Sequence, residues 1–264
     1  MGAVENPWDT HAEAYDDWVA RRERGLVPGA GMDGLLGVLL DLLGDVAGLA
    51  ALDAGCGSGF LARILAARGA SVTGIDLSPR LIAKARERDS DGAIDFRVAD
   101  LSQPLPDLAG RFDCIGSYLA LNDVADYVGF AESLAALARP GGRLAVALNN
   151  HYSLPVRGHL TDYFASGSRG VYGGMSAALG GELRYYQRTM GDYMDAFLGV
   201  GWRLVRLVDV PAAPRDDLRL PPGSRFPLFT VLAFDKPEWG GGAQRGVAAA
   251  HGLSGGDRRG RERG

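Results

Sequence analysis

Short apolar runs alternate with segments of helical periodicity through the middle of the chain, and this alternation limits the folds open to it. Five runs are predicted to be strands: 49–55, 70–78, 94–101, 112–121 and 143–150. The apolar residues of the first run show no alternation with polar ones, which indicates a buried strand. Helical periodicity covers three segments between them: 59–69, 79–90 and 127–140. Strands that alternate with helices imply right-handed crossovers and helices on both faces of a parallel sheet. The sequence therefore predicts an α/β fold with a doubly wound sheet.

The same reasoning extends to both sides of this region. Further helices are expected at 8–24, 32–46 and 190–201, and further strands at 202–210 and 226–236. Thr189 stands directly before the last helical segment and is a plausible N-cap. The helix at 8–24 carries apolar residues at spacings of three and four, so we expect it to cover the sheet.

Two segments depart from the alternating pattern. Residues 151–188 are rich in glycine and tyrosine and too long for an ordinary connection, which indicates a lid or a local insertion. Residues 239–264 hold many glycines and five arginines and are predicted to be a disordered tail. The predicted organisation is one main domain over 1–238, with 151–188 inserted, followed by the tail 239–264.

Charge and composition limit the kinds of partner that the protein is expected to bind. The 28 Lys and Arg against 32 Asp and Glu give a net charge of −4 and a pI near 5.6, so we expect neither nucleic acid nor an anionic membrane as a partner. Two cysteines, no signal-peptide pattern and an apolar stretch interrupted by Asp41 and Asp45 favour a cytoplasmic protein without disulfides. A small-molecule substrate fits best, and the sequence carries no signal of oligomeric state.

Glycines mark the end of the first predicted strand. Gly55, Gly57 and Gly59 follow it directly and precede a helix, where a ligand can approach backbone that lacks Cβ atoms. A nucleotide-type cofactor fits this loop. In the dinucleotide pattern the last glycine falls one place later, where this chain has Phe60, which weighs against a bound pyrophosphate. Asp76, at the end of the second strand, is placed to accept hydrogen bonds from ribose hydroxyls, or alternatively to cap the next helix.

The third strand ends in Asp100, whose carboxylate is placed either for an adenine amine or for capping the following turn. With this residue the order "LDAGCGSG", "GIDLS", "VADL", "RFDCIGS" and "RPGGRL" is complete. The set resembles the consecutive motifs of class I S-adenosylmethionine-dependent methyltransferases, in particular the bacterial small-molecule branch similar to the quinone-biosynthesis methyltransferases. The resemblance runs from about residue 45 to 150.

The resemblance implies a seven-stranded, mainly parallel sheet of the Rossmann-like methyltransferase type, with the last strand antiparallel beside the sixth. It implies S-adenosyl-L-methionine as cofactor, no metal, and methyl transfer to a small organic molecule in secondary or cofactor metabolism. The cofactor-binding residues that it implies are Tyr15, Asp53, Ala54, Gly55, Gly57, Asp76, Leu77, Asp100, Leu101 and Tyr118.

Methyl transfer requires alignment and exclusion of water more than it requires catalytic groups. His151, after the fifth strand, is the candidate general base, with substrate contact or a structural role as the alternative. Asn122 stands where many relatives carry His or Glu. The candidate substrate-binding residues are Asn122, Tyr152, Tyr172 and Tyr186, although the tyrosines could instead pack the insertion's own core.

Three other functions stay open at this point. The fold could use bound cofactor as a scaffold for a non-methylating cyclisation. A nicotinamide-dependent oxidoreductase is disfavoured by Phe60, and a methyltransferase acting on RNA or protein is disfavoured by the acidic balance of charge.

Overall fold

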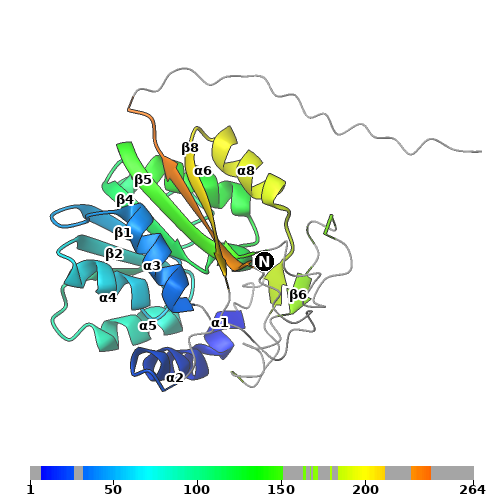
Figure 1. Ribbon diagram of the computed structural model, residues 1–264. Helices are drawn as coiled ribbons and strands as arrows, with labels where there is room; N and C mark the ends of the chain where they lie inside the picture. The colour runs from blue at the N-terminus through cyan, green and yellow to red at the C-terminus, as the bar shows by residue number, and fades with distance from the viewer. Residues whose placement is uncertain are drawn as a thin grey trace, which may run out of the picture.

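A computed structural model describes residues 7–26, 32–150, 163–164, 167, 169–171, 179, 184–211 and 227–238. These residues form a seven-stranded sheet in the order β3-β2-β1-β4-β5-β9-β8 (Figure 1). Its strands are β1 (Ala50–Ala54), β2 (Ser71–Asp76), β3 (Asp95–Val98), β4 (Phe112–Tyr118), β5 (Ala138–Asn149), β8 (Arg203–Pro211) and β9 (Pro227–Asp235).

The strand directions agree with the predicted topology. Strands β1 to β5 pair in parallel, and β9 pairs antiparallel with both β5 and β8. The last strand is thus inserted between the fifth and the sixth strands of the main sheet, as expected. The order reverses between β1 and β4, so the chain leaves these two neighbouring strands in opposite directions. In open α/β sheets, ligands bind outside the carboxyl ends of the strands at such a reversal.

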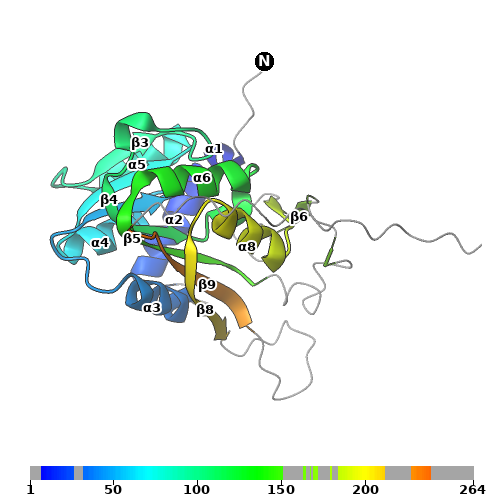
Figure 2. The same cartoon turned by 90° about the horizontal axis from the view of Figure 1, so that it is seen from above.

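Helices cover both faces of the sheet (Figures 1 and 2). The described helices are α1 (Pro7–Thr10), α2 (Ala12–Glu23), α3 (Met32–Leu43), α4 (Phe60–Ala67), α5 (Pro79–Arg88), α6 (Tyr127–Leu137) and α8 (Met190–Gly199), with short 3-10 helices η1 (Pro106–Leu108) and η2 (Leu121–Asp123). Buried residues of α3, α4 and α5 form one apolar cluster with the sheet. Those of α6 and α8 form a second cluster on the opposite face.

Local sequence fixes several helix starts. The Ser78 side chain accepts a hydrogen bond from the backbone N–H of Leu81, and Pro79 occupies the first turn of α5. The predicted cap at Thr189 is confirmed: its side chain accepts from the N–H of Asp192, whose carboxylate accepts from the N–H of Thr189 in return. Each cap satisfies backbone donors that the helix leaves without a partner.

Three expectations about element boundaries differ from the structure. The helix expected over 8–24 is divided at His11 into α1 and α2. Strand β5 begins at Ala138, five residues earlier than expected, because 139–142 form an irregular stretch in which the register with β4 shifts. The region 151–188 contains an antiparallel hairpin of β6 (Arg169–Val171) and β7 (Arg184–Tyr186) that its composition did not reveal. Most of the predicted lid, and the tail 239–264, lie outside the described residues.

Glycine substitutions provide a test of the packing. A Cβ at Gly74, within β2, would lie 2.7 Å from the Phe96 ring and 3.1 Å from the Cys56 sulfur, and both of these side chains are buried. We expect Gly74→Ala to lower the free energy of unfolding by about 1–3 kcal/mol through overpacking. Gly37→Ala, in an exposed turn of α3 where a Cβ meets nothing within 4 Å, should raise it by up to about 1 kcal/mol. Urea denaturation measures both, and equal effects of the two changes would contradict the packing described.

Candidate functional site

The loop after β1 lies against the loop after β4. Gly55, Gly57 and Gly59 have φ values of 75°, 53° and 82°, in the left-handed region that side chains disfavour. A Cβ at Gly55 would overlap the Cβ of Ala120. Glycine is therefore needed in this loop for two reasons: the backbone conformation has positive φ, and the loop closely approaches the segment after β4.

Asp53 is a buried carboxylate beneath this loop. Its Oδ2 accepts a hydrogen bond of 2.8 Å from the N–H of Ala62 in the first turn of α4. Its Oδ1 has no hydrogen-bond partner among the residues that the structure describes, and the residue is 1% exposed. Burial, with a smaller contribution from Asp76, raises the pKa of Asp53 to about 7. The site therefore holds a carboxyl group that gains from a positively charged or hydrogen-bond-donating neighbour.

Asp76 ends β2 and faces the same loop. Its Oδ2 accepts from the N–H of Gly57 and its Oδ1 from the N–H of Ser78, both at 2.9 Å. Burial raises its pKa, although these backbone bonds oppose the shift. A carboxylate has about four acceptor positions, so two backbone bonds leave capacity for further donors. Asp76 thus combines a local turn contact with an orientation toward the glycine loop.

The other residues expected to bind the cofactor near β2 and β3 differ in their exposure and in their hydrogen bonds. Asp100 accepts from both the N–H and the hydroxyl of Ser102, at 2.9 and 2.6 Å, which is the turn-capping arrangement considered as its alternative. Leu77 is 53% exposed, whereas Leu101 is buried in the apolar cluster on the α6 face. Ala54 is fully buried in that cluster as well.

Tyr15 covers the glycine loop. Its ring would be 3.3 Å from a Cβ placed at Gly57, and it stacks against Trp18 with ring centroids 6.2 Å apart. Burial and then the negative charge of Asp76 raise the pKa of the Tyr15 phenol. Helix α2 therefore lies over the carboxyl ends of β1 and β2, with Tyr15 on its inner face.

Ion pairs attach α2 to the main sheet layer. Glu23 pairs with Arg63 of α4 at 2.5 Å and with Arg88 of α5 at 3.1 Å. Arg88 also pairs with Asp16 at 2.7 Å. These side chains are only partly exposed, so their attraction is screened less than that of a fully exposed pair.

Arg22 is a site residue that the sequence analysis missed. Its side chain lies beside Phe60 and Tyr118, with its Cζ 4.8 Å and 5.8 Å from their ring centroids. Its Nη2 donates to the Tyr118 hydroxyl at 3.2 Å and pairs with Asp33 at 3.4 Å, while its Nε has no partner within the described ranges. Its spacing from Tyr15 places it on the apolar stripe of α2, and an arginine on such a stripe was the available signal.

A second group lies beyond the loop after β4. Asn122 is fully buried, accepts from the N–H of Asn149 at 3.0 Å, and donates from Nδ2 to the Tyr193 hydroxyl at 3.4 Å. The ring of Tyr186 lies 4.9 Å from the guanidinium carbon of Arg188. The predicted His151, Tyr152 and Tyr172 lie outside the described residues.

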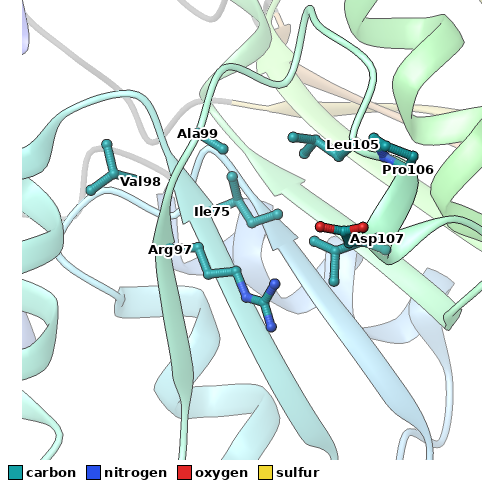
Figure 3. Close-up of a pocket in the computed structure, with 8 residues that line it drawn as sticks. Ile75, Arg97, Val98, Ala99, Leu105, Pro106 and Asp107 are labelled. Carbon is teal, nitrogen blue, oxygen red and sulfur yellow. The ribbon is translucent and has the colours of Figure 1, made fainter.

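A cavity of about 240 Å³ adjoins β2 and β3 (Figure 3). Its lining residues are Ile75, Arg97, Val98, Ala99, Leu105, Pro106, Asp107 and Leu108. Ile75 and Leu108 belong to the apolar cluster on the α6 face, and residues of η1 cover the strands there. The cavity therefore adjoins the ends of β2 and β3, with Ile75 directly before Asp76 and Ala99 directly before Asp100.

Comparison with known proteins finds a family match in the middle of the chain. Residues 52–146 match the family described as Methyltransferase domain. The ubiquinone biosynthesis O-methyltransferase of Pseudomonas paraeruginosa is 34% identical over 113 residues, which are 42% of this chain and 49% of that protein. The protein of the same name from Xylella fastidiosa is 38% identical over 107 residues, 40% of this chain and 44% of that protein. The chain spans about half the length of the curated relatives that it matches.

Solved structures share the fold over more of the chain. An S-adenosylmethionine-dependent methyltransferase described as putative, from Listeria monocytogenes, has a TM-score of 0.64 at 21% identity and covers 80% of this chain and all of its own. Another, from Mesorhizobium loti, has a TM-score of 0.61 at 24% identity, covering 79% of this chain and 99% of its own. Together with the family match over 52–146, they confirm the resemblance and the Rossmann-like methyltransferase fold.

The described part of the chain also bears on membranes and disulfides. None of its helices has the length and apolar character needed to cross a bilayer. Cys56 and Cys114, the two cysteines of the sequence, are free and buried.

The raised pKa of Asp53 predicts a pH-dependent stability. Between its ordinary value of 3.8 and about 7, the folded protein holds a proton that the unfolded chain has lost, so the free energy of unfolding falls as pH rises through this window. Asp53→Asn removes this loss. Its free energy of unfolding relative to the unsubstituted protein should therefore increase by on the order of 2 kcal/mol between about pH 5 and pH 8.

Asp113→Asn is the matched control for this measurement. The N–H of Ala50 and then Arg139 hold the pKa of Asp113 below its usual range, so that carboxylate contributes stability that is lost only as pH falls below about 4. Urea denaturation across the pH range distinguishes the two. A constant difference for Asp53→Asn would contradict a protonated, buried Asp53.

Proposed function

We propose that this chain, a methyltransferase fold with the family's domain over residues 52–146, transfers a methyl group from S-adenosylmethionine to a small organic acceptor. The observation that carries the proposal is the glycine loop at the reversal of strand order, with Asp53 and Asp76 directed at it. The curated relatives are named for ubiquinone biosynthesis, which supports a small molecule of cofactor or secondary metabolism as acceptor.

Two unsatisfied polar atoms fit the amino-acid end of this cofactor. Asp53 Oδ1 and Arg22 Nε are buried and have no hydrogen-bond partner in the described part of the chain. The charges of Arg22 and Asp53 both act on the pKa of the Tyr15 phenol, which lies over the glycine loop. A buried acceptor and a buried donor left without partners are costly unless a ligand satisfies them. The ammonium and carboxylate groups of the methionine moiety supply the matching charges.

The adenosine end is assigned to the ends of β2 and β3. Asp76 keeps acceptor capacity for the ribose hydroxyls beside its two backbone bonds. The exposed Leu77 offers apolar surface for the adenine ring. Asp100 uses Oδ1 for Ser102, which leaves its second oxygen for the adenine amine.

When bound, S-adenosylmethionine supplies an electrophilic methyl group. The chain's own residues have to position the acceptor and keep water out. Tyr15 and α2 cover the loop on one side, and Tyr118 closes the end of β4 beside Arg22. Asn122 has an amide that cannot take a proton, and its bonds to Asn149 and Tyr193 make it a positioning residue.

The proposed general base and two acceptor contacts lie in the segment after β5. His151 is proposed to take the proton of an acceptor hydroxyl or amine, because a histidine can titrate near neutral pH. Tyr152 and Tyr172 are proposed to contact the acceptor from the same segment. Tyr186, at the end of β7, is proposed to contact the acceptor as well, and it is the one of these three tyrosines that the structure describes.

The first test is binding and turnover together. We expect S-adenosylhomocysteine to bind by calorimetry, and acceptor methylation to be accompanied by its formation. Asp76→Ala should weaken this binding by about 1–3 kcal/mol, because it removes charge-assisted hydrogen bonds. Asp95→Ala, at the opposite end of β3, should leave it unchanged. No binding by the unsubstituted protein, or turnover of an acceptor without methyl gain, would reject the proposal.

The second test separates the two ends of the cofactor. Arg22→Met should weaken binding of S-adenosylhomocysteine by about 1–3 kcal/mol through loss of a charged donor. Binding of 5′-methylthioadenosine, which lacks the amino-acid end, should be nearly unaffected. The neighbouring Arg21→Met, half-exposed on the outer face of α2, is the matched control. Equal losses for both ligands would remove Arg22 from the amino-acid end.

A further inference from the structure

A second buried guanidinium lies between η2 and α8. Arg188 is 3% exposed and lies two residues after β7. Its Nη2 donates to the carbonyl oxygens of Val124 and Ala125 at 2.6 and 2.7 Å. Its Cζ lies 4.4 Å from the ring centroid of Tyr127 and 4.9 Å from that of Tyr186. One nitrogen of the guanidinium is thus bonded to backbone carbonyl groups, and two aromatic rings lie close to it.

The other terminal nitrogen is not satisfied. Arg188 Nη1 is buried and has no hydrogen-bond partner in the described segments, and no carboxylate there forms an ion pair with Arg188. The negative charges of Asp123 and Asp192 act on the neighbouring Tyr193 phenol. A buried cation without a counter-charge is costly, and contacts with aromatic faces offset only part of that cost.

The neighbouring Tyr193 phenol does not supply a negative charge to Arg188. Burial raises the pKa of the Tyr193 phenol to about 12, although the charge of Arg188 and a side-chain hydrogen bond with it oppose the shift, so the phenol remains neutral at physiological pH. The two carbonyl oxygens bonded to Nη2 are neutral as well. The described surroundings of Arg188 therefore contain aromatic surface and dipoles but no anion bonded to it.

The position of Arg188 relates it to the glycine-loop site. Gly55 abuts Ala120, and residues 120–125 lead from there to the carbonyl groups that hold Arg188. Asn122, in the middle of this stretch, joins it to the end of β5 and to Tyr193 of α8. Arg188 is therefore joined to the glycine loop through the segment that follows β4.

We propose that Arg188 binds an anionic group of the acceptor, and that the substrate class is an organic carboxylic acid. The inference rests on the proposed function, because it assigns the acceptor half of that site. A guanidinium presents parallel N–H donors that match a carboxylate, and Nη1 is the nitrogen left to serve it. The rings of Tyr127 and Tyr186 flank the guanidinium and offer contact area for an aromatic or apolar body next to the carboxylate.

The experiment compares acids with their amides. Benzoate, indole-3-carboxylate and hexanoate, each paired with its primary amide, are titrated by ligand-observed NMR into protein saturated with S-adenosylhomocysteine. We expect at least one acid to bind about 10-fold or more tightly than its amide, the ratio that a hydrogen bond to a charged group supports. Arg188→Gln should bring this ratio close to one, and Arg188→Lys should keep part of it.

Controls separate the possible failures. Arg203→Gln, an exposed change on β8, should retain the full preference for acids. Affinity for S-adenosylhomocysteine reports whether each variant is folded. If Arg188→Gln loses this affinity, the acid-to-amide ratios of Arg188→Lys and of the unsubstituted protein are compared instead. The proposal is overturned if no acid is preferred over its amide, or if the preference is unchanged in a folded Arg188 variant. Loss of S-adenosylhomocysteine binding by the unsubstituted protein would instead reject the proposed function.

Discussion

Contact between the backbone after β1 and the backbone after β4 is the constraint on which the site depends. The order of the parallel strands reverses between β1 and β4, so the connections after these two strands run in opposite directions. Without a contact between them, the two loops would lie apart. Gly55 permits the approach because a Cβ there would overlap that of Ala120. The β4 loop bends to meet it, with Leu119 at a φ of 62°, which is uncommon for a residue with a side chain. The N–H of Leu119 donates to Ala147 of β5, so the bend is tied to the next strand.

Several buried polar side chains on either side of this contact have an atom without a hydrogen-bond partner in the described part of the chain. Some carboxylates of the described structure have a cationic partner: Asp113 pairs with Arg139, and Glu23 pairs with Arg63 and Arg88. Around the contact, Asp53, Arg22 and Arg188 each bury an atom that has no described partner. Buried polar groups without a partner are rare in folded proteins, so each of these atoms calls for an explanation, and a bound ligand is the one proposed here. The charges of these groups also differ in sign: a carboxyl group and a guanidinium lie on one side of the contact, and a second guanidinium lies on the other.

The sequence predicted the sheet and the acidic residues of the loop because both depend on local order. Strand ends, glycines and Asp76 stand in a fixed succession, and Thr189 is recognisable from its place before a helix. Arg22 and Arg188 were missed because their burial comes from tertiary packing, α2 against α4 and the β7 hairpin against η2. The early start of β5 was missed because Pro140 and its glycines read as a break, whereas the strand accommodates them by shifting register. The pairing of β6 with β7 depends on residues far apart in a segment without clear periodicity.

The bridge at Glu23 has a consequence for how the molecule responds to its surroundings. A single carboxylate links the cover helix to α4, which begins at the glycine loop, and to α5, which begins after Asp76. Electrostatic fastening of this kind weakens in salt, whereas the apolar clusters on the two faces of the sheet do not. High ionic strength therefore weakens the attachment of α2 only in part, because these side chains are only partly exposed, and it leaves the apolar scaffold beneath the helix intact.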